Sequence, residues 1–546
     1  MELCGEIAIA ANAIEIRQAV QKKAAAIFIS GRLLANRLLG QDDEGLLSLT
    51  EYAQFFRNLR LTTNVPLIAD GQAGFGNPLN AYETAQELIR SGANYLVLND
   101  QKYPSHSQVP NSPEDLAEFL GKIKACQDSL QMTDCQIILK LDGVAAYGLN
   151  GLEKRLKLAQ KLGIKNLLIS KINQEQLMQL SSETLLKIGL GFEDGQLAKE
   201  AAALIKPKFW LDLKAKVPIK TPEPNVSDLV CVCNNGFNKF KQLRQQFKQA
   251  VFAKDNIVNM VVAPDSLAAK IAEKQGYRAI FAAGYATSAS NLAKPDRGLA
   301  DFGVMLNKCR EIVNAVNIPV FADADTGYGG LNNIVRTVAS YEAIGACGLF
   351  LEDQIWPKRC GHMTGKRVES TEVLTEKIKM AVKTRQDPNF LIMSRTDARA
   401  VYDLSTAIMR SQTYLKAGAD LVFIEAPASI DELKAELAAF PDTPLMLNMI
   451  EGGATPILSA EQAQKMGFRI IVHPTALTYA QTYATDRVLS ILKRTGKTAA
   501  AKDIMLSFSE FNNFIGLSAI DQLEEQYSHE KMQALLSKMA ISSISN

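Results

Sequence analysis

One short loop of the chain carries side chains that could take part in catalysis. The run Pro357-Lys-Arg-Cys-Gly-His362 brings the ammonium group of Lys358, the thiol of Cys360 and the imidazole of His362 together. A thiol can transfer protons or attack carbon, and cationic neighbours stabilise its thiolate form. We therefore expect Cys360 to belong to a reactive site in which Lys358, Arg359 and His362 favour the thiolate.

A second candidate site is the acidic pair Asp323-Ala-Asp325, which follows the apolar run 319–322. Two acidic residues that flank one residue at the end of a strand point to the same face and can bind a divalent cation; Mg²⁺ typically takes one or two carboxylates plus substrate oxygens. Taken alone, such a pair is more often solvated or caps a helix. Its position at a strand end, with Glu352 and Cys360 nearby, favours metal binding.

The elements that must position these residues are short apolar runs separated by segments with helical periodicity. The segment 333–344, for example, places Ile334, Val338 and Tyr341 on one helix face. Strands that alternate with helices predict a parallel sheet, and eight such units predict a (β/α)₈ barrel. The predicted strands are 259–263, 278–281, 319–322, 348–351, 390–393, 420–424, 444–447 and 469–472.

Active sites of such barrels lie on the loops at the C-terminal ends of the strands. Polar side chains follow the last six predicted strands, so we expect them to converge. They are Asp323 and Asp325, Glu352, Arg395, Glu425, Asn448 and His473. Arg395 could simply pair with Asp397, but its position at a strand end favours contact with a substrate.

The first half of the chain repeats the second half. The matched residues, each pair 253 apart, include Gly31 and Gly284, Asp70 and Asp323, Gly74 and Gly327, and Asp100 and Asp353. A period this long indicates duplication of a whole domain. The sequence therefore predicts an α/β protein with two tandem (β/α)₈ barrels of the TIM type. The predicted parts are a barrel over 1–215, a proline-rich linker over 216–240, and a barrel with extra C-terminal helices over 241–546.

The first half lacks the residues that would carry chemistry. Gln72 stands in place of Asp325, Asn99 in place of Glu352, and Ser105, Ser107, Val109 and Ser170 in place of Lys358, Cys360, His362 and Glu425. Replacing two carboxylates by amides lowers the affinity for a divalent metal. We infer one working barrel and one that has lost its chemistry.

The motifs of the second half resemble those of the isocitrate lyase/phosphoenolpyruvate mutase superfamily, over residues from about 241 to about 530. The matching segments are Asp323-Ala-Asp-Thr-Gly-Tyr-Gly329, Glu352-Asp-Gln354, Pro357 to His362, Ser394-Arg-Thr-Asp-Ala398 and Asn448-Met-Ile-Glu-Gly-Gly453. The Lys-Arg-Cys-Gly-His form is most similar to that of 2-methylisocitrate lyases and their dimethylmalate lyase and oxaloacetate hydrolase relatives.

The resemblance implies a role for each matched residue. It implies Mg²⁺, or Mn²⁺, near Asp323 and Asp325, with Asp296 and Glu352 reaching the ion largely through water. It implies that Cys360 protonates a carbanion product, with Lys358, His362 and Arg395 beside it in catalysis. The substrate, a small carboxylic acid, would meet Ala283, Gly284, Tyr285, Gly361, Glu425 and Asn448.

One segment departs from the family pattern. Methylisocitrate lyases commonly carry Tyr-x-Ser-Gly-Gly after the second strand, whereas this chain has Phe281-Ala-Ala-Gly-Tyr285. A hydroxyl that could act as the base and a substrate-facing serine are therefore missing. Tyr285 could partly replace them, which favours a substrate smaller than methylisocitrate.

The function expected from these features is that of a Mg²⁺-dependent carbon–carbon lyase acting on a small 2-hydroxy di- or tricarboxylic acid, similar to 2-methylisocitrate lyase, which releases pyruvate and succinate. Oxaloacetate hydrolysis and dimethylmalate-type cleavage are the enzymatic alternatives, and a non-catalytic ligand-binding or scaffold protein is the alternative of another class. The terminal helices could close their own barrel or swap between subunits, so a homo-oligomer and a pseudo-dimer of the two barrels both stay open.

Composition excludes other classes of partner. The net charge of +2, from 60 Lys and Arg against 58 Asp and Glu, gives no basic surface for a nucleic acid. No apolar run is long enough to span a bilayer, and no signal peptide opens the chain. The eight cysteines show neither a disulfide framework nor zinc-ribbon spacing. We therefore expect a cytoplasmic protein.

Overall fold

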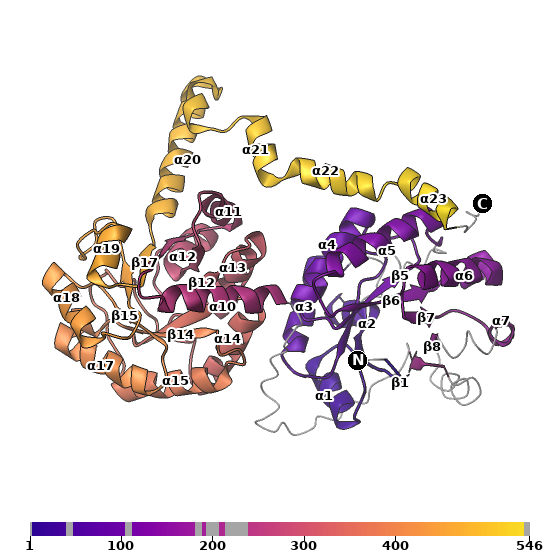
Figure 1. Cartoon of the computed structure of the whole chain (residues 1–546), viewed down its shortest axis with the longest axis horizontal. Helices are drawn as coiled ribbons and strands as arrows, with labels where there is room; N and C mark the ends of the chain where they lie inside the picture. The colour runs from indigo at the N-terminus through magenta and orange to yellow at the C-terminus, as the bar shows by residue number, and fades with distance from the viewer. Residues whose placement is uncertain are drawn as a thin grey trace. The chain divides into compact units, whose positions relative to one another are not determined.

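The computed structural model describes residues 3–39, 47–103, 112–180, 188–192, 207–212 and 238–539. Contacts divide the described residues into two compact units (Figure 1). One unit contains the residues up to 212 together with those from 508 onward, and the other contains residues 238–507. Each unit is built around one parallel sheet.

The sheet of the first unit closes on itself because its first two strands, which are separated only by Ile7, lie at its two edges. β1 pairs with β9, and β2, which follows after Ile7, pairs with β3, so these two short strands join the edges of the sheet. All pairings are parallel. The strands are β1 (Gly5–Glu6), β2 (Ala8–Ala10), β3 (Ile27–Ile29), β4 (Leu67–Asp70), β5 (Tyr95–Asn99), β6 (Gln136–Leu141), β7 (Asn166–Ile169), β8 (Gly189–Phe192) and β9 (Phe209–Asp212).

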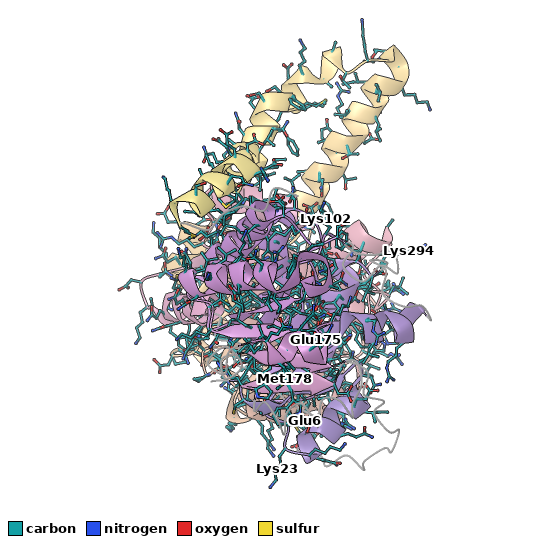
Figure 2. All side chains as sticks on the ribbon, turned by 90° about the vertical axis from the view of Figure 1, so that its right-hand side faces the viewer. Glu6, Lys23, Lys102, Glu175, Met178 and Lys294 are labelled. Carbon is teal, nitrogen blue, oxygen red and sulfur yellow. The ribbon has the colours of Figure 1, made fainter. Side chains whose placement is uncertain are left out.

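Helices follow the strands of the first barrel and cover them. They are α1 (Ala13–Gln21), α2 (Gly31–Leu39), α3 (Leu49–Arg60), α4 (Pro78–Arg90), α5 (Leu116–Leu130), α6 (Val144–Lys161) and α7 (Gln174–Met178). The alternate, inward-facing strand residues fill the barrel with Phe28, Ile68, Val97 and Phe209. Charged side chains such as Glu6, Lys23 and Glu175 lie on its outside (Figure 2).

The C-terminal helices belong to the first unit. They are α21 (Phe508–Ile515), α22 (Leu517–Gln526) and α23 (His529–Lys538), and α23 packs on α5. Met532 and Leu536 are buried among the core residues of this barrel, and the hydroxyl of Tyr527 donates a 2.7 Å hydrogen bond to Asp128 Oδ2. Apolar burial and this partly buried hydrogen bond together hold α23 and the end of α22 on the barrel.

The second barrel has the strands predicted from the sequence. They are β10 (Val258–Val262), β11 (Ala279–Ala282), β12 (Val320–Asp323), β13 (Gly348–Glu352), β14 (Leu391–Thr396), β15 (Leu421–Ile424), β16 (Met446–Asn448) and β17 (Ile470–His473). All neighbours pair in parallel, and a bridge between Val422 and Leu445 joins the two ends of the sheet. Aromatic residues fill the interior, where the ring of Phe281 lies 6.0 Å from Phe321 and 5.8 Å from Phe350.

The helices that alternate with the strands of the second barrel surround them, whereas the long helix after the last strand extends away from the barrel (Figure 1). The helices of this unit are α10 (Asn238–Phe252), α11 (Ser266–Lys274), α12 (Gly284–Leu292), α13 (Phe302–Ala315), α14 (Leu331–Ala343), α15 (Thr371–Thr384), α16 (Ala398–Val401), α17 (Leu404–Lys416), α18 (Ile430–Ala439), α19 (Ala460–Met466) and α20 (Ala476–Thr495), followed by the 3₁₀ helix η2 (Ala499–Ile504). No helix in the described part of the chain is long and apolar enough to cross a membrane.

The backbone confirms that the two barrels are copies of one domain. Gln72 and Asp325 both adopt φ 47°, and Phe75 and Tyr328 adopt φ 53° and 58°. A positive φ is uncommon for residues other than glycine, so its recurrence at matched positions reflects a common loop. The predicted architecture of two tandem barrels is confirmed.

The division along the chain differs from the predicted one. The predicted second domain ran to residue 546, whereas the described residues from 508 onward group with the first barrel. Met532 and Leu536 of α23 are buried there, which the sequence of the helix does not reveal. Residues 216–237 of the predicted linker lie outside the described residues.

Candidate active site

A cavity of about 240 Å³ opens at the C-terminal ends of the strands of the second barrel. Most of the residues predicted from the sequence line it. These are Ala283, Tyr285, Asp296, Asp323, Lys358, Cys360, Gly361, His362, Arg395, Glu425 and Asn448. Three further predicted residues, Gly284, Asp325 and Glu352, are buried directly behind this lining. His473, which the sequence analysis expected to converge with them, is not among the lining residues.

The acidic pair after β12 is held by backbone hydrogen bonds. The amide of Gly284, the first residue of α12, donates to Asp323 Oδ2 at 2.8 Å, and the amide of Asp325 donates to Asp323 Oδ1 at 2.8 Å. A Cβ atom at Gly284 would lie 3.1 Å from Asp323 Oδ2 and 3.3 Å from Lys358 Nζ. Glycine at this position therefore leaves the room in which the acidic and basic groups meet.

Lys358 is paired with two acidic residues. Its Nζ is 2.9 Å from Asp296 Oδ2 and 2.7 Å from Asp325 Oδ1, and the side chain is 3% exposed. Glu352 ends β13 close by. Both of its carboxylate oxygens are buried and receive no hydrogen bond from the described residues, although Arg395 Nε lies 3.3 Å from Oε2.

This group carries more negative charge than its cations balance. Burial, with the nearby carboxylates of Asp323 and Asp296, raises the pKa of Asp325 to about 7 against the effect of Lys358. Burial likewise raises the pKa of Glu352 well above its usual range, against Arg395 and Lys358. A carboxylate whose ionised form is disfavoured in this way would be stabilised by a bound cation.

The arrangement fits a hydrated Mg²⁺. Among the described residues, no three His, Cys, Asp or Glu side chains are placed to ligate one ion directly. Mg²⁺ does not require three, because it usually keeps several waters and binds through one or two carboxylates. The buried oxygens of Glu352 that lack hydrogen bonds, and the excess of carboxylates, are the features that a hydrated dication would satisfy.

Arg395 lies at the floor of the cavity and is held in one orientation. Its Nε is 3.0 Å from Asp397 Oδ2 and its Nη2 is 3.1 Å from Glu425 Oε2. Its guanidinium carbon lies 5.3 Å from the ring centroids of both Phe350 and Phe423. In the described structure no side chain accepts a hydrogen bond from Nη1, which leaves this nitrogen for a substrate carboxylate. Arg395 thus pairs with Asp397 and also faces the cavity.

His362 and Asn448 both contact Glu425. His362 Nδ1 accepts a 3.2 Å hydrogen bond from the amide of Ala454, so Nε2 carries the proton and donates to Glu425 Oε1 at 3.1 Å. Asn448 Nδ2 lies 3.4 Å from the same oxygen. Burial would raise the pKa of Glu425, but Arg395 and His362 outweigh it and hold the pKa at about 2. Glu425 is therefore an anion that orients its neighbours.

The predicted thiolate form of Cys360 is wrong. Burial raises the pKa of the Cys360 thiol, the carboxylates of Asp296 and Glu425 raise it further, and the backbone at His362 and the charge of Arg395 compensate only in part. Lys358, which the sequence placed beside the thiol, is engaged by the acidic residues instead. Cys360 is thus a neutral thiol at neutral pH, which is the form that can donate a proton.

Several residues at the site were not predicted. Lys366 Nζ lies 2.7 Å from Asp397 Oδ1 and also donates to the carbonyl of Gly361, so it holds the loop of Cys360 over the cavity. Tyr479, on the first turn of α20, lines the cavity together with Glu451. Glu451 lies in the motif that begins at Asn448, which could have indicated it, whereas no motif marks Tyr479 or Lys366.

At the corresponding position of the first barrel, polar side chains contact one another. Lys140, the counterpart of Arg395, lies 2.6 Å from Asp142 Oδ2, and the hydroxyl of Ser170 donates to Asp142 Oδ1. Ser170 here replaces Glu425, so the second anion is gone. The counterparts of Lys358, Cys360 and His362, which are Ser105, Ser107 and Val109, lie outside the described residues.

Comparison with known proteins gives one family for both barrels. The family described as phosphoenolpyruvate phosphomutase matches residues 8–160 and 247–492. The first match falls in the first barrel and the second in the barrel that contains the cavity, which agrees with the duplication.

Individual relatives match about half of this chain. The 2,3-dimethylmalate lyase of Eubacterium barkeri is 43% identical over 49% of this chain and 93% of its own length. The 2-methylisocitrate lyase of Shewanella oneidensis is 34% identical over 52% of this chain and 98% of its own length. A solved structure of 2,3-dimethylmalate lyase, a PEP mutase/isocitrate lyase superfamily member, aligns with a TM-score of 0.50 at 31% identity over 52% of this chain and 95% of that chain.

Proposed function

Since the chain belongs to the phosphoenolpyruvate phosphomutase family, we propose that it is a carbon–carbon lyase whose substrate is a small 2-hydroxy carboxylic acid. The observation that carries this proposal is the meeting of a neutral thiol, a buried lysine and a fixed arginine in one cavity. Cys360 and Lys358 lie on the loop after β13, Arg395 lies on β14, and all three line the same 240 Å³ space. A lyase of this kind needs a proton donor and cationic groups where negative charge develops.

The proposed reaction breaks the bond between C2 and C3 of the acid. The electron pair stays on C3 and is shared with the carboxylate next to it, while the C2 hydroxyl loses its proton and becomes the carbonyl of a 2-oxo acid. C3 then takes a proton from the thiol of Cys360, and the thiolate regains a proton from the solvent that received the one lost by the hydroxyl. Protons and electrons balance, and the products are a 2-oxo acid and a saturated carboxylic acid.

The other residues bind and orient the substrate in this proposal. Arg395 Nη1 and the amide of Asn448 bind a substrate carboxylate, and Glu425 fixes both of these side chains and His362. The ammonium of Lys358 stabilises negative charge on the substrate oxygens. Gly361 leaves the space for Glu425, because a Cβ atom there would lie 2.5 Å from the glutamate side chain.

A divalent cation completes the proposed site. Mg²⁺ bound near Asp323 and Asp325, with Asp296 and Glu352 reaching it through water, would polarise the substrate oxygens as a Lewis acid. Mn²⁺ has similar preferences for oxygen ligands and could take its place. In this proposal the chemistry lies in the second barrel, and the first barrel provides a scaffold.

The test measures the products that the full chain forms with Mg²⁺ and with a chelator. The expected product is a 2-oxo acid from 2,3-dimethylmalate, 2-methylisocitrate or isocitrate, whereas hydrolysis of oxaloacetate would give oxalate and acetate. We expect 2-oxo acid release that depends on the metal and that falls about 10²- to 10⁴-fold in the Cys360→Ser variant, the usual range for removal of a general acid. A matched control is Cys309→Ser, which changes a buried cysteine on α13 that does not line the cavity.

The outcomes separate the candidate functions. Oxalate and acetate from oxaloacetate, without cleavage of the hydroxy acids, would replace the lyase by a hydrolase. Binding of these acids, measured by calorimetry, without turnover would favour the ligand-binding protein. No turnover and no binding would refute the proposal.

A further inference from the structure

Two tyrosines meet at the mouth of the cavity in the second barrel. Tyr285 lies on the first turn of α12, directly after Gly284, and Tyr479 lies on the first turn of α20. Their hydroxyl oxygens are 3.1 Å apart, and their rings meet edge to face with centroids 6.4 Å apart. Both side chains line the cavity. This pair, which we call the tyrosine pair, spans two helices that pack against each other.

The tyrosine pair is neutral. One hydroxyl donates its hydrogen to the other, so together the two phenols offer a ligand one remaining hydrogen and no charge. Glu451 lines the cavity as well, and its Oε2 accepts a hydrogen bond from the hydroxyl of Thr475, which precedes α20. The outer part of the cavity therefore presents two phenols and a carboxylate.

The cations of the cavity are deeper and already have partners. Lys358 is bound by Asp296 and Asp325, and Arg395 keeps only Nη1 for a ligand. His362 is neutral in the tautomer that the hydrogen bonds require. With a dication and Lys358 at one substrate carboxylate and Arg395 at another, no cation among the described lining residues is left for a third.

From this inventory we propose that the tyrosine pair and Glu451 determine specificity, admitting a dicarboxylate with an alkyl substituent and rejecting a substrate with a third carboxylate. The inference rests on the proposed lyase function and narrows its substrate class. A methyl group can lie against the phenol rings without loss. A carboxylate in the same place would give up its hydration for one phenol hydrogen and would face the charge of Glu451.

The test compares kcat/KM of the full chain for 2,3-dimethylmalate and for 2-methylisocitrate, at saturating Mg²⁺ and one pH. We expect the dicarboxylate to be preferred by at least about tenfold. Tyr479→Arg brings a cation to the mouth and should shift the ratio toward the tricarboxylate by roughly fivefold, the upper end of what a partly exposed ion pair contributes. Tyr479→Phe keeps the neutral ring and should leave the ratio as it is.

Two further variants keep the result interpretable. Glu451→Gln removes the negative charge at the mouth and keeps an oxygen that can accept the hydrogen bond from Thr475, so it should shift the ratio in the same direction even if the arginine variant is unstable. Tyr483→Arg adds the same charge one turn further along α20, where the side chain is 73% exposed and does not line the cavity, and it should not change the ratio.

Each outcome bears on the inference. A wild-type protein that cleaves 2-methylisocitrate as well as 2,3-dimethylmalate overturns the inference and leaves the lyase function standing. A preference for the dicarboxylate that neither Tyr479→Arg nor Glu451→Gln reduces also overturns it, since specificity would then come from elsewhere. If wild type cleaves neither acid, the proposed function fails and the inference fails with it.

Discussion

Replacing Asp325 by asparagine should stabilise the metal-free protein and abolish its stabilisation by Mg²⁺. The carboxyl of Asp325 is buried at 1% exposure beside Asp323, and its pKa is raised to about 7. Its charged form is therefore unfavourable in the folded state when no dication is bound. Asparagine has nearly the same shape and no charge, so it removes this repulsion and also removes one carboxylate from the proposed metal site.

The magnitude follows from the pKa of Asp325. The usual value of 3.8 applies in the unfolded chain and about 7 in the folded chain, so the folded state binds the proton more tightly. The protonated carboxyl therefore contributes a stability that is fully present below pH 4 and is lost as the pH rises toward 7. Each unit of difference between the folded and unfolded pKa corresponds to about 1.36 kcal/mol. At pH 8 the ionised carboxyl thus costs roughly 4 kcal/mol, and Asp325→Asn should recover about 2–4 kcal/mol, because Lys358 loses one of its two partners.

The assay is thermal unfolding of the full chain at pH 8 and at pH 5, in chelator and in Mg²⁺. In chelator the variant should unfold at a higher temperature than wild type, and the difference should shrink at pH 5, where wild-type Asp325 keeps its proton. In Mg²⁺ at about 100 times Kd, wild type should gain about 2.7 kcal/mol and the variant little. Asp442→Asn, at an 88% exposed side chain of the same barrel, controls for the change in net charge.

Two results would refute this reasoning. If Asp325→Asn lowers the unfolding temperature in chelator at pH 8, the ionised carboxyl stabilises the site, and the excess of carboxylates over cations does not destabilise the folded state. If the variant keeps the full effect of Mg²⁺, the ion binds elsewhere.

Three further predictions concern the ionisation of Cys360, the buried ion pair of Glu425 and the number of bound Mg²⁺ ions. Because the pKa of the Cys360 thiol is raised, iodoacetamide should modify Cys360 more slowly at pH 8 than the exposed Cys4. Modification of Cys360 should accelerate as the pH rises further, and peptide mass spectrometry measures both sites. Glu425→Gln should destabilise the second barrel by about 3–5 kcal/mol in urea unfolding at pH 7, because Arg395 loses a buried anionic partner. The difference in stability between wild type and variant should shrink below pH 4.5, where the unfolded wild-type glutamate is protonated. Calorimetry of the full chain should show one Mg²⁺ per chain, and Asp323→Asn should abolish it; a second site that survives this change would show that the first barrel binds metal.

The architecture and much of the site could be predicted from sequence because a parallel barrel links position in a strand to position in space. Polar residues at the C-terminal ends of barrel strands generally lie around the same opening, although His473 at the end of β17 does not line the cavity. Asp323, Arg395 and Asn448, which are far apart in the chain, therefore meet as the strand pattern indicated. The offset between the two halves gave independent support, since it placed the same turns at the same strand ends.

The missing parts depend on burial and on contacts that no pattern encodes. The state of Cys360 is set by how deeply the loop is buried and by where Lys358 points, and the sequence shows only that the two residues are close along the chain. Tyr479 reaches the cavity from a helix that follows the last strand, with no motif around it. The packing of α23 on α5 depends on which surface accepts Met532 and Leu536.

A comparison of the two barrels distinguishes the residues that stabilise a strand end from those proposed to take part in catalysis. In the second barrel Asp353 accepts hydrogen bonds from Thr396 and from the amide of Asp397, which ties β13 to β14. In the first barrel Asp100 accepts the equivalent bond from the amide of Asp142. These aspartates are kept because their loss would leave buried amides without partners, at a cost of about 1–3 kcal/mol each. Glu425 instead pairs with Arg395, and in the first barrel both residues differ, as Ser170 and Lys140, so that copy lacks the glutamate without leaving a buried arginine unpaired.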